Sequence, residues 1–110
     1  MTRNGWYILD DDHNPVPVSG LLEWAEWVSV HDSRRHVACD EIGGVQVSTI
    51  FLGWDHKGRF SAGPPILFET MILEGEHHGW QRRCATFGEA QALHGRAVRL
   101  VRTGSEEPLQ

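Results

Sequence analysis

The chain contains little cysteine and no long apolar run. Only Cys39 and Cys84 occur among its 110 residues, too few for the disulfide framework of a small secreted domain. No stretch approaches the ~18 apolar residues of a membrane span. The stretch MTRNGWYILDDDHN also lacks the basic head and the apolar run of a secretory signal. We therefore expect a cytoplasmic protein with two reduced thiols and no contact with a membrane.

Basic residues are also in deficit. Ten lysines and arginines stand against fifteen acidic residues, which gives a formal net charge of −5 at pH 7. Nucleic-acid binding needs a basic footprint that contacts phosphates, so we expect no nucleic-acid partner. A protein partner with basic side chains fits this charge better.

Motifs of catalysis and metal binding are missing as well. The sequence has no HExxH, GxSxG, P-loop or GxGxxG pattern. Its seven histidines show no Cys/His spacing of the zinc type. We expect no metal, no cofactor and no catalytic residue, which favours a binding protein over an enzyme.

The residues that are present predict one domain over residues 1–102, followed by a flexible tail over 103–110. Hydrophobic residues make up 40% of the chain, enough for one ordinary core. Short apolar runs at 6–9 and 16–18 surround a turn rich in Asp and Asn, which predicts a small hairpin. A helix capped by Ser19 is expected to follow.

The second half of the chain alternates in the manner of a sheet. Runs at 36–42 and 45–54 flank Gly43-Gly44, a hairpin signal, and further strands are expected at 66–73 and 80–86. A helix over 87–101 then presents Phe87, His94 and Val98 on one face, and Thr86 and Glu89 have the spacing of a capping box. His94 is expected to be a core residue with one nitrogen bonded. The predicted fold class is α+β: a four-stranded antiparallel meander with two helices on one face, plus the small amino-terminal hairpin.

Several strings in this order resemble a known group of proteins. They are WYILD, NPVPV, LLEWAEW, VSTIFLGWDH, GPPILFETMI and ATFGEAQALH. Together they resemble small proteins encoded by tailed bacteriophages and prophages, over about residues 6 to 98. The resemblance implies a phage origin and a bacterial host cell, and it implies no particular activity, cofactor or catalytic residue.

Candidate ligand-binding residues gather around the loop at 53–65. Asp55 and His56 form a base–carboxylate pair only if a third residue draws them together, because adjacent residues on an extended chain point apart. Glu69 lies within an apolar strand. Its carboxylate either faces the open side of the sheet or is buried and paired, with Thr49 or Ser48 as a strand partner. The plain alternative is a solvated loop beside a half-exposed carboxylate.

The chain contains five tryptophans, which is more than one core of this size needs. Trp24 falls on the apolar face of the first helix with Leu21, Ala25 and Val28, whereas Trp27 projects toward its polar side. Trp54 lies at a strand end. Exposed tryptophan is enriched at binding hot spots, although tryptophan also serves as a lid over an open sheet.

These observations lead to one leading hypothesis and one alternative. The first is a non-enzymatic accessory protein of a phage or prophage that binds a host or phage protein, and inhibition of a bacterial defence system is one role that the resemblance suggests. A second copy of the chain is the other candidate partner. The alternative is a small-ligand binder or a metal-independent, hydrolase-like enzyme that uses the loop at 53–65 and Glu69. The candidate binding residues are Trp27, Trp54, Asp55, His56, Glu69 and Thr49.

Overall fold

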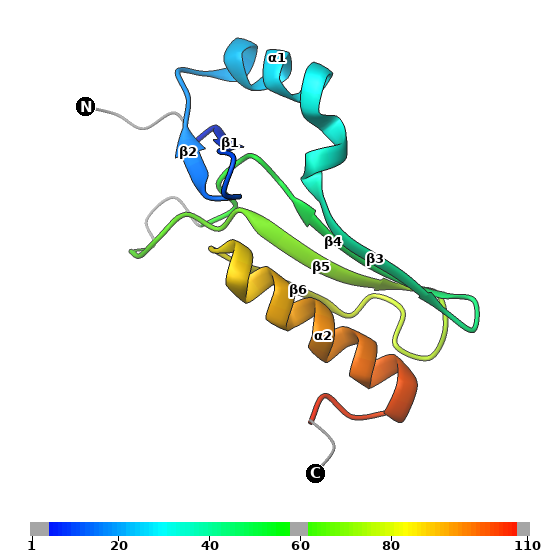
Figure 1. Cartoon of the computed structure of the whole chain (residues 1–110). Coiled ribbons are helices and arrows are strands. Elements are labelled where there is room, and N and C mark those ends of the chain that lie inside the picture. The colour runs from blue at the N-terminus through cyan, green and yellow to red at the C-terminus, as the bar shows by residue number, and fades with distance from the viewer. Residues whose placement is uncertain (1–4, 58–61, 108–110) are drawn as a thin grey trace.

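The computed structural model of the chain describes residues 5–57 and 62–107. Its elements follow one another as a hairpin, a helix, a short 3₁₀ turn, a four-stranded sheet and a final helix (Figure 1). Their bounds are β1 (Tyr7–Leu9), β2 (Pro15–Pro17), α1 (Leu21–His31), η1 (Asp32–Arg35), β3 (His36–Ile42), β4 (Val45–Phe51), β5 (Phe68–Leu73), β6 (Gln81–Cys84) and α2 (Phe87–Thr103).

The sheet is an antiparallel meander in the order β3-β4-β5-β6, and β1 and β2 form a separate hairpin. The predicted α+β fold class is therefore confirmed. The turn between β3 and β4 lies at Gly43-Gly44, so that Ile42 pairs with Val45. β3 and β6 form opposite edges of the sheet, which keeps Cys39 and Cys84 apart as free thiols.

α2 covers one face of the sheet and contacts all four strands. It begins with the predicted capping box: the Glu89 backbone N–H donates to the Thr86 hydroxyl at 3.1 Å, and the Glu89 carboxylate accepts from the Thr86 backbone N–H. Below it lies the apolar core. The buried hydrophobic residues of the sheet and of α2 are Val47, Phe51, Phe68, Ile72, Cys84, Ala90, Ala97 and Leu100.

α1 meets the sheet differently from α2. It stands at one end of the sheet, where it contacts chiefly η1 and β1 (Figure 1). Its start differs from the expected Ser19 cap, because the N-cap residue is Gly20. Ser19 instead donates its backbone N–H and hydroxyl to Glu23, at 2.7 and 2.9 Å. These two hydrogen bonds to the charged form lower the pKa of the Glu23 carboxyl.

The hairpin β1–β2 contacts the loop after β4, the start of α2 and η1. The Tyr7 backbone N–H donates to the Gly53 carbonyl at 2.8 Å, and the His13 ring stacks on Phe87 of α2 with 4.5 Å between centroids. Arg34 of η1 donates to the carbonyls of Leu9 and Asp10. The hairpin thus fixes α1 and the loop after β4 relative to the core. Within the described residues, none of the helices has the length and apolar character needed to cross a bilayer.

Candidate functional site

The loop after β4 is held in place by Asp55. One carboxylate oxygen, Oδ1, accepts hydrogen bonds from the backbone N–H groups of Lys57 and Ile66, each at 2.9 Å. The other oxygen lies 3.8 Å from the Lys57 ammonium. The Asp55 backbone N–H donates to the Gly5 carbonyl. Asp55 therefore joins the two ends of the loop and the amino-terminal segment.

His56 is engaged elsewhere. Its Nδ1–H donates to the Trp54 carbonyl at 2.7 Å, and its ring meets the edge of the Trp54 ring. Asp55 and His56 thus bind separate partners, and the described part of the loop does not draw them into one base–carboxylate pair. Residues 58–61 of the predicted loop lie outside the described residues.

Glu69 and Thr49 lie on opposite faces of the sheet, which corrects the expectation of one shared pocket. Thr49 pairs with Thr70 across β4 and β5, and both side chains point toward α2. Successive side chains of a strand alternate between faces, so Glu69 points to the uncovered face. It is nevertheless buried, because Gln81 and Arg83 of β6 donate to it, with the Arg83 Nε at 2.8 Å. The partners expected for a buried Glu69, Thr49 and Ser48, were wrong.

A series of side-chain hydrogen bonds centred on the buried His94 runs from β3 to β5. Its Nδ1 lies 2.8 Å from the Thr49 hydroxyl, and its Nε2 lies 2.7 Å from Oδ2 of Asp40 on β3. The Thr49 hydroxyl also forms a hydrogen bond of 2.7 Å with the Thr70 hydroxyl. His94 is a core residue as predicted, but both of its nitrogens are bonded rather than one.

Carboxylate, imidazole and hydroxyl follow one another here as they do in a nucleophilic triad. In a working triad the hydroxyl is accessible to substrate, whereas here the hydroxyl is the buried end. Thr49 is completely buried, whereas the Asp40 end of the series reaches the surface. A substrate therefore has no route to the hydroxyl. The arrangement instead satisfies the polar groups of four elements inside the core, where an unpaired group would be costly.

Four of the five tryptophans lie on α1 or near it, and the fifth, Trp80, packs against the apolar core beneath α2. Trp27 is half-buried and packs edge-on against Phe51, with ring centroids 6.1 Å apart, so the expectation that it projects toward the polar side of α1 was wrong. Trp24 on α1 contacts Trp6, and Trp6 contacts Trp54, with centroid distances of 5.0 and 6.4 Å. Trp54 is 47% exposed, which makes it the large aromatic residue of the set that is open to a partner.

Trp27→Ala is accordingly expected to destabilise the fold by about 2–3 kcal/mol, somewhat less than the ~3–5 kcal/mol of a fully buried aromatic deletion. The reason is the loss of its contact with Phe51. Urea unfolding followed by tryptophan fluorescence measures this. An unchanged unfolding midpoint would return Trp27 to the candidate binding surface.

The two thiols are expected to differ in reactivity. Cys84 is buried, and desolvation together with the nearby Glu89 carboxylate raises its pKa to about 11, whereas Cys39 is exposed. Because the thiolate is the reactive form, Ellman's reagent at pH 8 should titrate one thiol rapidly in the native protein and two after denaturation. Equal rapid reaction of both thiols in the native protein would contradict this burial.

The described residues contain no group of three or more His, Cys, Asp or Glu side chains arranged to hold a metal ion. Comparisons with protein-family models, with characterised proteins and with solved structures found no match.

Proposed function

We propose that the protein acts by binding another protein through the outer face of α1, which we define as Leu21, Leu22, Ala25 and Val30 with the flanking Glu23 and Glu26. The observation that carries the proposal is the poor burial of this helix. None of the residues of α1, all of which the structure describes, is fully buried. Leu22 is 81% exposed, Val30 75% and Leu21 55%.

Folding alone gives little reason for such a surface. Scattered exposed apolar residues are ordinary, but here they share one side of one helix, because Trp24, Trp27, Val28 and His31 occupy the opposite side. An isolated helix of 11 residues is marginal in water, so helices of this length depend on packing. A partner that covers the outer face would supply packing that the rest of the chain does not.

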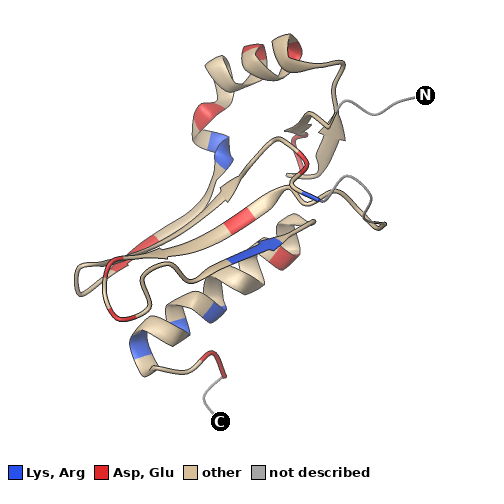
Figure 2. Cartoon of the chain, turned by 180° about the vertical axis from the view of Figure 1, so that it is seen from behind, with Lys and Arg blue, Asp and Glu red and all other residues tan. Residues whose placement is uncertain are grey.

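The charge of α1 indicates what kind of partner fits. Its acidic residues are Glu23 and Glu26, its last turn carries His31, and the next arginine along the chain is Arg34 in η1 (Figure 2). Apolar side chains interspersed with carboxylates complement an apolar groove bordered by Lys or Arg. Trp54, which is 47% exposed, offers a further apolar side chain outside the helix.

The phage resemblance supports a setting for this binding. In the proposed role the protein is a non-enzymatic phage or prophage product in the bacterial cytoplasm, and its partner is a host or phage protein. Inhibition of a bacterial defence complex is the specific role that this setting suggests. The buried position of Thr49 and the separate engagement of Asp55 and His56 support binding rather than hydrolysis.

The proposal is tested by capture from bacterial lysate with three immobilised proteins: the wild type, Leu22→Asp and Gln91→Asp. Both variants place one carboxylate on an exposed helical position, so they match in charge. A partner of the outer face should be retained by the wild type and by Gln91→Asp and lost from Leu22→Asp. Equal capture by all three would refute the proposal. Recovery of the chain itself, also lost with Leu22→Asp, would identify a homodimer.

A further inference from the structure

A second surface, separate from α1, lies between β6 and α2. A groove of about 390 Å³ is lined there by Arg82 and Arg96 on its two sides and by the less polar Cys84, Ala92 and Leu93. Figure 2 shows basic positions on β6 and on α2. The chain carries a net charge of −5, so this local concentration of arginine runs against the overall balance.

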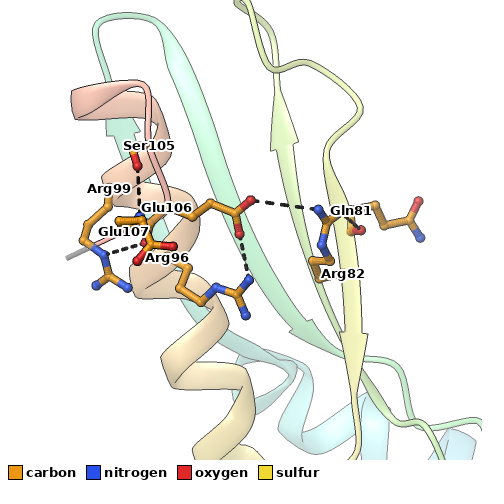
Figure 3. Close-up of polar contacts among 7 residues, drawn as sticks. All are labelled: Gln81, Arg82, Arg96, Arg99, Ser105, Glu106 and Glu107. Carbon is orange, nitrogen blue, oxygen red and sulfur yellow. Dashed lines mark hydrogen bonds and ion pairs between the residues drawn. The ribbon is translucent and has the colours of Figure 1, made fainter.

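The protein places one of its own carboxylates against this groove. Glu106, which follows α2, has one oxygen 2.9 Å from the Arg96 guanidinium and the other 4.0 Å from that of Arg82 (Figure 3). Its backbone carbonyl accepts a hydrogen bond from Arg99 Nε at 3.2 Å. The side chain and the main chain of one acidic residue are therefore both recognised, by arginines from two elements.

Arg82 is held in position by contacts other than Glu106. Its guanidinium lies over the Trp80 ring, 4.5 Å from the centroid, and it donates to the Gln81 carbonyl at 2.9 Å. Arg96 and Arg99 are three residues apart on α2, so both project toward one side of the helix. Planar guanidinium groups suit carboxylates because they offer several donors in a fixed geometry.

We propose that this groove binds an acidic peptide segment of a partner protein, and that Glu106, which lies against Arg82 and Arg96 at the edge of the groove, is an internal stand-in for it in the free chain. The partner's carboxylate takes the place of Glu106 between Arg82 and Arg96, and its neighbouring carbonyl takes the bond from Arg99.

The ion pairs of Glu106 with Arg82 and Arg96 are weak enough for a partner to displace them. The Glu106 side chain is 29% exposed and the side chains of Arg82 and Arg96 are more exposed still, and ion pairs open to solvent contribute little to stability. A tethered segment competes at a high effective concentration, so a partner must offer more than one acidic residue or further contacts with Ala92 and Leu93.

A peptide fits the groove better than a nucleic acid does. Glu89 also lines it, and this carboxylate opposes a continuous run of phosphates, whereas a peptide can place its carboxylates away from Glu89. The group actually seated between the arginines is a peptide carboxylate whose own carbonyl is bound.

The test uses a fluorescent peptide with the sequence TGSEE, acetylated and amidated at its ends, titrated by fluorescence anisotropy. The proteins are the wild type, Glu106→Gln, and Glu106→Gln combined with Arg82→Gln and Arg96→Gln. Releasing the stand-in should tighten peptide binding at least about tenfold relative to the wild type. The triple variant should bind at background level, and higher salt should weaken binding by Glu106→Gln.

The controls separate this proposal from others. A TGSQQ peptide should not bind, Leu22→Asp should leave the effect of Glu106→Gln unchanged, and circular dichroism should show that each variant is folded. Failure of TGSEE to bind Glu106→Gln better than the wild type would overturn the proposal. Preferential binding of a single-stranded oligonucleotide by Glu106→Gln would also overturn it, in favour of a phosphate site.

Discussion

Phe51→Ala should destabilise the protein by about 3–5 kcal/mol, in the range of fully buried aromatic deletions. Phe51 is completely buried and joins three parts of the fold. Its ring lies 5.3 Å from that of Phe68 on β5 and 6.1 Å from that of Trp27 on α1. Removing it leaves a cavity at the point where α1 meets the sheet, and total stabilities of ~5–15 kcal/mol leave little margin for such a loss.

Urea unfolding followed by circular dichroism measures the effect, with Phe51→Leu as the matched variant. Leucine keeps most of the apolar volume, so its cost should stay below about 1.5 kcal/mol. Similar unfolding midpoints for the wild type and Phe51→Ala would show that α1 and the sheet do not share this core.

The second large effect is expected at Gly53, where the chain leaves β4. Its φ is +78°, and a Cβ built there would lie 2.1 Å from Nε1 of Trp24. Alanine would therefore carry the ~1–2 kcal/mol cost of a left-handed backbone. Its Cβ would also overlap the Trp24 ring. Because the Tyr7–Gly53 hydrogen bond holds Gly53 in place, Trp24 and α1 would have to move away. Overpacking adds about 1–3 kcal/mol, so Gly53→Ala should lose roughly 2–5 kcal/mol.

Gly44→Ala is the control for the backbone contribution. Gly44 has a similar φ of +85°, and among the described residues nothing lies within 4 Å of its added Cβ. It should lose only about 1–2 kcal/mol. If both alanine variants lose the same stability, Trp24 does not pack on Gly53 and α1 is free of the sheet.

The sheet could be predicted because its local signals agree with one another. Gly43-Gly44 lies between two alternating runs, and a two-residue connection fixes both the pairing and the register of β3 and β4. α2 could be predicted for the same reason, since the Thr86–Glu89 capping box and an apolar stripe indicate the same start and the same buried face.

The orientation of α1 could not be predicted. Leu21, Leu22, Ala25 and Val30 make the outer face nearly as apolar as the side that carries Trp24 and Trp27. A hydrophobic pattern selects a face only when the other face is polar. The similar apolar character of the two sides of α1 therefore explains both why the side of Trp27 was predicted wrongly and why the outer face is exposed.

The relative faces of Thr49 and Glu69 depended on a register that the sequence does not specify. Alternation within β5 separates Glu69 from Thr70, but the connection between β4 and β5 is too long for a turn type to set their pairing. The contact between Asp40 and His94 joins residues 54 positions apart and has no periodic signal. The sequence predicts that Glu106 belongs to a flexible tail over 103–110, because nothing local connects it with Arg82 on β6.

The proposed binding of a protein by the outer face of α1 can be measured once its partner has been captured. Isothermal titration of the captured partner with the wild type, with Leu22→Asp/Val30→Asp and with Gln91→Asp tests it most directly. Carboxylates buried without partners in an apolar interface are costly, so the double variant should bind at least about 100-fold more weakly, a loss of roughly 2.7 kcal/mol. Gln91→Asp should bind as tightly as the wild type. Equal affinity of the double variant and the wild type, with both folded, would show that the partner does not bind the outer face of α1.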